Sequence, residues 1–327
     1  MKSFLVALEH LSVINIAGQQ CKEYLHGQIT IDTKHFDAHT ARFGAHCDFK
    51  GKMWANFIVS EYNDSFHLLM PKSAVAESLT QFKKYGVFSK VDIAQLEQDW
   101  SVFGGAGAEL KSDLQALFPN LASDHLSHVA NEFGQVITFN DTSERYLIGL
   151  KPDGAQRLKD LSASYRSAST KEDIMLWHKL EILAGIGFIE GATVGEFVPQ
   201  MFNLQALNGI DFNKGCYMGQ EVVARTKFLG KNKRALYILQ AINTKDSVET
   251  QSETDKHAMN ISASDILEKP VGENWRKAGT VINSAAPKGE ATLLLAVLPN
   301  DTEVDDVLRL KTSLSEFRVM PLPYALE

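Results

Sequence analysis

Residues 213–221, with the sequence NKGCYMGQE, hold the side chains best suited to chemistry in this chain. A single cysteine, Cys216, stands directly after Gly215 and three positions before Gly219. Glycine adopts backbone angles that other residues avoid, so the chain can turn sharply or approach a ligand closely at both positions. A thiol just before a helix and beside a cation such as Lys214 is favoured as the reactive thiolate. The stretch therefore predicts an exposed thiol for redox or thiol-exchange chemistry.

The helix that would support this thiol begins after Gly219. Gln220 and Glu221 suit a first helical turn, and the two valines that follow supply apolar surface. We expect Arg225, which lies further along this helix, to come close to Cys216 and to favour its thiolate. The alternative is a small buried cysteine that only fills space between a strand and a helix.

A run of basic residues follows the thiol. No acidic residue occurs between positions 222 and 245, and the cations of this window are Arg225, Lys227, Lys231, Lys233, Arg234 and Lys245. Such a run predicts a local anion site for phosphates or for a chain of carboxylates, in a protein whose formal net charge is −7. The alternative is an ordinary solvated face.

Length, charge and cysteine content exclude several classes of protein. The 327 residues suffice for two or three domains, and a net charge of −7 does not suit a protein coated for nucleic-acid binding. The three scattered cysteines, Cys21, Cys47 and Cys216, argue against a disulfide framework and for a reducing cytoplasm. The N-terminal residues do not resemble a signal peptide, and no apolar run approaches the roughly 20 residues of a membrane span. Walker A, dinucleotide and metal-binding motifs are missing, so we expect no resident metal.

Helices and strands alternate in the part of the chain that must position this site. VINI followed by AGQQCKEYLHGQIT predicts a strand that enters a helix bearing Cys21. Residues 41–71 have the pattern of a strand meander with turns at 48–51 and 62–65. Residues 72–86 predict an amphipathic helix that ends at a glycine. A second unit of this kind follows, so the order indicates an α+β sandwich, not a doubly wound sheet.

One later helix is well marked. Ser169 and Glu172 form a capping-box pattern, an apolar face with Trp177 follows, and Gly185 ends the helix. A tryptophan on such a face is more often part of the core than part of a ligand site.

The composition changes beyond residue 234, where short strand patterns replace helical ones and predict a small all-β domain. We therefore divide the chain into residues 1–231, an α+β module, and residues 232–327, a β domain. The polar run at 243–265 inside the second part is expected to be a solvated loop.

KGCYMGQE resembles the signature Lys-Gly-Cys-Tyr-x-Gly-Gln-Glu of the YgfZ family, the folate-binding relatives of the glycine-cleavage T-protein. Further segments carry the likeness along nearly the whole chain: HCDFKGKMWANF, KKYGVFSKV, FVPQMFNLQALNGIDFNKGCY, KFLGKNKRAL, GENWRKAGTV and MPLPYALE. The resemblance implies a T-protein-like α+β fold, with two intertwined α+β subdomains and a C-terminal β-barrel around a central opening that holds tetrahydrofolate. It also implies a monomeric cytoplasmic protein that supports iron–sulfur client enzymes, such as tRNA methylthiotransferases, and through them tRNA thiolation.

The resemblance also assigns residues to the folate. Trp177 matches one of two family tryptophans near the pterin, whereas Leu11 stands where the other would be and cannot stack face to face. A family carboxylate is replaced by Leu183, and Glu181 lies about 200° around a helix from that position, so we expect no simple substitute.

Three residues of the cysteine motif, Tyr217, Gln220 and Glu221, are further candidates for cofactor contact. Lys227, Lys231, Lys233 and Arg234 are candidates for holding a polyglutamate tail or another anion.

Two functions remain open on these residues. The first is a folate-binding accessory protein in which Cys216 does redox or thiol-exchange chemistry. The second is an aminomethyl transferase like the T-protein, which needs a well-placed carboxylate and does not carry the KGCY cysteine. Direct contact with tRNA is not expected, because the basic run lacks the interleaved aromatic residues that single-strand binders use.

Overall fold

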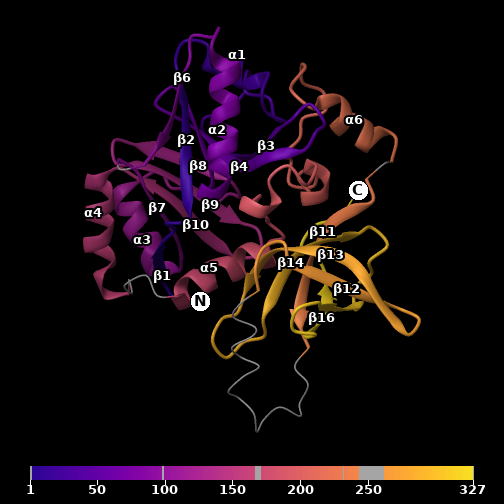
Figure 1. Cartoon of the computed structure of the whole chain (residues 1–327). Coiled ribbons are helices and arrows are strands. Elements are labelled where there is room, and N and C mark those ends of the chain that lie inside the picture. Colours follow the sequence, from indigo (N-terminus) through magenta and orange to yellow (C-terminus); the bar gives the residue numbers. More distant parts are fainter. Residues whose placement is uncertain (1, 98, 166–170, 231, 243–260, 327) are drawn as a thin grey trace.

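A computed structural model describes residues 2–97, 99–165, 171–230, 232–242 and 261–326 of the chain. Figure 1 shows two packed sheets with helices in the indigo-to-magenta part and a barrel in the orange-to-yellow part. Of the expected features, Ser169, Lys231 and most of the polar run 243–265 lie outside the described residues.

The first sheet is antiparallel throughout and has the order β3-β4-β5-β2-β6. Its strands are β2 (Leu11–Ala17), β3 (Arg42–Cys47), β4 (Met53–Tyr62), β5 (Ser65–Pro71) and β6 (Asp92–Leu96). Asn63 and Asp64 both have positive φ, at 49° and 58°, as the tight turn from β4 to β5 requires. The turn expected at positions 62–65 is therefore confirmed, and the backbone N–H of Gly51 closes the other expected turn by donating to Asp48.

The second sheet is also antiparallel and has the order β1-β7-β10-β9-β8. Its strands are β1 (Phe4–Ala7), β7 (Ser101–Ala106), β8 (Ser127–Asn131), β9 (Gly134–Asn140) and β10 (Glu144–Leu150). Because β1 precedes the whole first sheet in the chain but pairs with β7 in the second, the two subdomains are intertwined. The α+β expectation is confirmed.

The helices cover these sheets and lead to the barrel. The α-helices are α1 (Cys21–His26), α2 (Lys72–Gly86), α3 (Ala108–Leu117), α4 (Pro152–Leu161), α5 (Lys171–Leu183) and α6 (Gln220–Phe228). Three short 3-10 turns are η1 (Ser162–Ser164), η2 (Gly191–Thr193) and η3 (Pro199–Phe202). The helices expected at 72–86 and up to Gly185 are confirmed, and Gly185 itself has a φ of +65°.

The C-terminal part is a closed barrel of six strands in the order β11-β14-β13-β12-β15-β16. These strands are β11 (Arg234–Ala241), β12 (Ile266–Val271), β13 (Asn274–Ala285), β14 (Leu293–Pro299), β15 (Val307–Leu310) and β16 (Glu316–Met320).

Strand β11 is apolar on both sides because it serves two cores. Tyr237 and Leu239 pack inside the barrel, whereas Leu236 and Ile238 pack against the α+β module. Asn203 fixes the junction, since its side chain donates to the carbonyl of Leu236 and accepts from that residue's backbone N–H. The barrel and the module thus form one packed unit, as the T-protein-like expectation requires.

Candidate functional site

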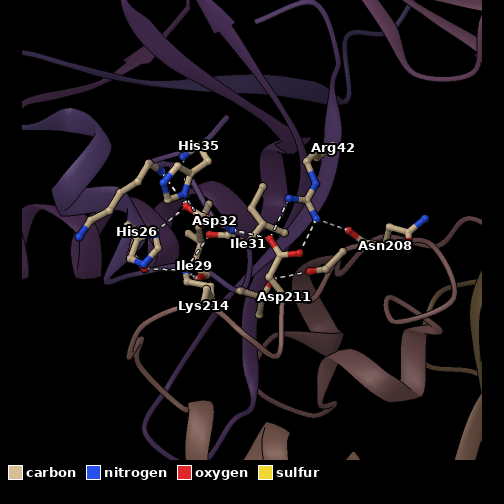
Figure 2. A network of polar contacts seen from close by, with 12 residues as sticks. His26, Ile29, Ile31, Asp32, His35, Arg42, Asn208, Asp211 and Lys214 are labelled. Atoms are coloured by element: carbon tan, nitrogen blue, oxygen red, sulfur yellow. Dashed lines mark hydrogen bonds and ion pairs between the residues drawn. The ribbon is translucent and has the colours of Figure 1, made fainter. Parts of the chain in front are cut away.

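The loop that carries Cys216 is clamped by the lysine two positions before it. The Lys214 ammonium donates to the backbone carbonyls of His26, Ile29 and Ile31, at 2.6, 2.7 and 2.7 Å (Figure 2). Burial lowers the pKa of Lys214 to about 7. The three carbonyl acceptors oppose that effect, because only the protonated amine has three N–H donors. Lys214 therefore joins the loop to the segment that follows α1.

A carboxylate makes a second clamp on the same segment. Arg42 donates through both guanidinium nitrogens to Asp211, at 2.8 and 2.9 Å, although the two residues are 169 positions apart (Figure 2). Asp211 also accepts a 2.6 Å hydrogen bond from the backbone N–H of Asp32. Burial alone would raise the pKa of Asp211, but the hydrogen bonds from Arg42 and Asp32 outweigh it and lower the pKa.

Asp32 extends this network to two histidines. Its carboxylate lies 3.0 Å from Nδ1 of His26 and 2.9 Å from Nδ1 of His35. Burial and the charge of Lys214 lower the pKa of His26, so its ring is neutral at neutral pH and donates Nδ1–H to Asp32. The pKa of Asp32 is itself lowered, because hydrogen bonds from His35 and from the backbone N–H of Lys34 outweigh the effect of burial.

The far end of the loop is held by the turn between β3 and β4. Gly219 has a φ of +81°, and a Cβ atom built there would lie 2.5 Å from the carbonyl oxygen of Asp48. A Cβ built on Gly51 would lie 3.0 Å from Cβ of Val222. Only glycine permits both the backbone angle and the contact distance at position 219. Helix α6 thus begins where the sequence predicts, directly after Gly219.

Cys216 is exposed between these two anchors, whereas the other two cysteines are buried. Burial raises the pKa of both the Cys21 and the Cys47 thiol. Tyr217 is 7% exposed and its ring lies 4.9 Å from the Lys214 ammonium, so the residue after the thiol is anchored as well. The alternative of a buried cysteine at position 216 is therefore wrong, because Cys216 is exposed.

The cations expected to favour the thiolate make other contacts. Lys214 points at backbone carbonyls, and Arg225 pairs with Glu221 at 2.7 Å on the exposed side of α6. Lys227 lies over the ring of Phe212, at 4.5 Å. Of the remaining basic candidates, Lys233 is exposed and Arg234 reaches a carbonyl of β13 at 3.4 Å.

The residues assigned to the folate pterin lie elsewhere, on the apolar side of α5. Trp177 is 1% exposed, and Trp177, Leu11 and Glu181 line one cavity with only about 10 Å³ for the centre of a water molecule. That is room for about one water, not for a pterin ring. Glu181 is one turn from Trp177, so the two buried side chains share one side of α5, away from position 183. Leu183 packs against the core instead.

A more open cleft of about 250 Å³ lies beside this cavity, between α5, η2 and the barrel strand β13. His10, His178 and Glu190 line it, and Nδ1 of His178 lies 3.1 Å from the Glu181 carboxylate. Burial lowers the pKa of His178, but its hydrogen bond to Glu181 outweighs burial and raises the pKa. Burial and the nearby charge of Glu181 raise the pKa of Glu190. Convergent, half-buried polar groups with shifted pKa values are typical of a small-molecule site.

A larger cleft, of about 730 Å³, opens between β1, β2, β6 and β7 and also touches Leu11. It is lined by exposed Glu9 and Glu97 and has few buried polar groups directed into it, so the smaller cleft is the better candidate for specific recognition.

Known proteins resemble this chain along its whole length. Residues 256–313 match the family model described as "YgfZ, beta-barrel domain". The chain is 36% identical over 323 residues to the tRNA-modifying protein YgfZ of Klebsiella pneumoniae (strain 342), covering 99% of this chain and 93% of that protein. The protein of the same name from Escherichia coli O127:H6 is also 36% identical, with 94% of its length covered. The chain belongs to the YgfZ family.

Among solved structures, this YgfZ-family fold matches the glycine cleavage system aminomethyltransferase T from Bartonella henselae. The TM-score is 0.70, with 13% identity, over 98% of this chain and 86% of that one. The match confirms the T-protein-like fold.

The residues that the family resemblance singles out lie in two places. Tyr217 follows Cys216 in the loop, Gln220 and Glu221 begin α6, and Figure 1 shows α6 well separated from α5, which carries Trp177. Sequence reasoning missed Asp32, Arg42 and Asp211, which hold the loop, and His10, His178 and Glu190, which line the cleft. Only Asp211 had a local signal, because it stands five positions before Cys216 in a family-like segment. Among the described residues, no helix is long and apolar enough to cross a membrane.

Proposed function

We propose that this protein takes part in tRNA modification as a folate-binding accessory factor for iron–sulfur enzymes, with Cys216 as its working thiol. Its relatives are named tRNA-modifying proteins. The observation that carries the proposal is the single exposed thiol, held between the Lys214 and Gly219 anchors while Cys21 and Cys47 are buried. A thiol presented on a fixed loop can be approached by a second protein without any opening of the fold.

The folate part of the proposal rests on the cleft beside α5. A pterin carries N–H donors and ring acceptors, which Glu190, His178 and Asn283 can match by accepting and donating. The cleft volume of about 250 Å³ lies just below the roughly 300–1,000 Å³ typical of ligand pockets. Trp177 lies in the neighbouring small cavity with Glu181, whose carboxylate links that cavity to the cleft through His178. Reduced folate, when bound, would supply a carrier for a one-carbon unit.

A polyglutamate tail on such a folate would have to reach the basic residues Lys227, Lys233 and Arg234. Figure 1 shows α6, which carries Lys227, far from α5, so contact with Lys227 requires a long tail. Comparison of monoglutamyl and pentaglutamyl tetrahydrofolate by fluorescence titration tests it. A preference for the pentaglutamyl form that shrinks as salt rises supports the contact, and equal affinity at low salt refutes it.

The decisive test of the proposal is Cys216→Ser in cells that depend on this chain, with tRNA thiolation measured by mass spectrometry. We expect thiolation to be lost while folding and folate binding persist, since serine keeps the size of the side chain without its soft nucleophile. Asn213→Ala, at an exposed position on the same loop, is the matched control and should keep full thiolation. Full thiolation in the Cys216→Ser cells would refute a working thiol. The transferase alternative is tested separately, by assay of aminomethyl transfer to tetrahydrofolate.

A further inference from the structure

Large apolar side chains are exposed on both sides of the Cys216 loop. Phe49 is 74% exposed at the tip of the turn between β3 and β4, and Phe228 and Leu229 are 69% and 60% exposed at the end of α6. Single exposed apolar residues are normal, but a group of them beside a functional loop marks an interaction surface. None of these three side chains is needed for the packing of the core.

Local contacts bring these side chains to one small region. The turn that carries Phe49 packs on the start of α6, through the close approaches of Gly219 to Asp48 and of Gly51 to Val222. Helix α6 has nine residues and is therefore about 13 Å long. At its other end, the ring of Phe228 lies 6.0 Å from the ring of Phe212, which precedes the thiol by four positions. We call the region of exposed residues around this loop and α6, namely Phe49, Lys50, Cys216, Lys227, Phe228 and Leu229, the Cys216 face.

Positive charge accompanies the aromatic rings of this face. The Lys50 ammonium lies 5.4 Å from the Phe49 ring centroid, and that of Lys227 lies 4.5 Å from the Phe212 centroid. Glu221 is the acidic residue of α6, and its negative charge is balanced by Arg225, which lies 2.7 Å from its carboxylate. The Asp48 carboxylate is turned inward and accepts from the backbone N–H groups of its own turn. A protein of net charge −7 thus gathers cations where it exposes aromatic rings.

We propose that the Cys216 face binds a single-stranded segment of RNA. Bases of any sequence can stack on exposed phenyl rings, and the nearby lysines, such as Lys50 against the Phe49 ring, can contact adjoining phosphates. Between Arg225 and Arg234 the basic run has only one aromatic residue, Phe228, and this argued against RNA, but the fold supplies Phe49 from another part of the chain.

An acidic, apolar segment of a partner protein is the other occupant that this face could take. RNA is favoured because the exposed rings are flanked by cations, an arrangement that serves stacking and phosphate contact together. The proposal goes beyond the function of the thiol, since RNA binding to this face does not require Cys216 to react.

The test uses the full chain and fluorescence anisotropy with a labelled ten-nucleotide RNA and an unmodified tRNA transcript. The double variant Phe49→Ser/Phe228→Ser should lose at least about fivefold in affinity, since each stacked base contributes that much or more. Phe88→Ser is the matched control, because Phe88 is 98% exposed on the connection between α2 and β6, outside the face. Its affinity for RNA should equal that of the wild type. Thermal melts should coincide for all variants, since each removes only an exposed side chain.

Salt dependence separates stacking from charge. Lys50→Gln and Lys227→Gln should each flatten the slope of log affinity against log salt by about 0.7. A poly-glutamate peptide serves as a polyanion without bases and should bind more weakly than RNA. The proposal is overturned if RNA does not bind, if poly-glutamate binds as tightly as RNA, or if Phe88→Ser weakens binding as much as the double variant. Tighter binding of poly-glutamate would assign the face to an acidic protein instead.

Discussion

The ammonium of Lys214 lies 2.7 Å from the backbone carbonyl oxygen of Ile31. Two further carbonyls, of His26 and Ile29, take the remaining N–H donors of the same group. Because one ammonium group binds three backbone carbonyls, Lys214 fixes the position of the backbone around it as well as adding a positive charge. The lysine of the cysteine motif is thus a structural clamp that presents the thiol.

Replacement of this clamp should be costly. We expect Lys214→Met to lower the free energy of unfolding by about 3 kcal/mol, because buried carbonyl groups lose their partners. Urea denaturation measures the loss. Lys50→Met, at an exposed position, is the control and should stay within about 0.5 kcal/mol of the wild type. Equal effects of the two variants would mean that the three hydrogen bonds of Lys214 do not contribute to the free energy of unfolding.

The three cysteines should differ sharply in their rates of alkylation. Cys216 should react first in the native protein, because it alone is exposed, while burial raises the pKa of Cys21 and Cys47. Mass spectrometry after timed treatment with iodoacetamide reads out each site, and addition of urea should make all three reactive. Labelling of Cys21 before Cys216 without denaturant would contradict the structure.

Two glycines with positive φ offer a matched test of the loop's far anchor. Gly219→Ala should destabilise the protein by more than Gly230→Ala. Both glycines have positive φ angles, +81° and +59°, so the backbone angle alone does not distinguish them. Both substitutions carry the backbone penalty of about 1–2 kcal/mol. Only the alanine at 219 would also meet Asp48, because nothing lies within 4 Å of a Cβ at 230. Similar losses of thermal stability for the two variants would show that the turn at Asp48 can move to accept a Cβ atom at position 219, and would contradict this prediction.

Stability should fall in mild acid partly because of His46. Burial lowers the pKa of His46 to about 3, and its ring stacks on Phe82 at 3.8 Å. Between the unfolded pKa of about 6.5 and pH 3 the unfolded chain takes up a proton that the folded chain refuses. The free energy of unfolding therefore decreases as pH falls through this range, by up to about 1.4 kcal/mol per pH unit. Urea titrations at pH 7, 6 and 5 should show a shallower decrease for His46→Gln than for the wild type. His39→Gln, at an exposed position, is the control variant and should keep the decrease of the wild type.

Folate affinity should depend on the cleft beside α5. Glu190→Gln should weaken tetrahydrofolate binding about tenfold or more, since a charged acceptor is replaced by a neutral one. Glu221→Gln, on the exposed side of α6, should leave binding unchanged. Trp177→Phe tests whether the neighbouring small cavity affects folate binding, and it is safer than alanine, because truncation of so buried a tryptophan would cost about 3–5 kcal/mol of stability. Isothermal titration gives the affinities, and a loss with Glu221→Gln but not with Glu190→Gln would move the folate site to the cysteine loop.

Much of the local structure could be predicted from the sequence. Gly219, Gly86 and Gly185 mark helix boundaries because their backbone and capping preferences are local. The change to short strand patterns near Arg234 predicted the C-terminal β domain, since strand periodicity is visible within a few residues. The thiol, too, could be recognised in sequence, from its place between two glycines.

Only the tertiary structure decided how that thiol is held and what surrounds it. The pairing of Arg42 with Asp211 crosses 169 positions, and no periodicity within either segment encodes such a contact. Lys214 was expected to favour the thiolate of Cys216 by its charge, but in the fold its ammonium contacts backbone carbonyls instead. Buried carbonyls without a hydrogen-bond partner lower the stability of the protein, whereas a thiol without a neighbouring cation does not. Phe49 joins the Cys216 face for the same reason: proximity in space arises from sheet register and loop closure, which the order of residues alone does not display.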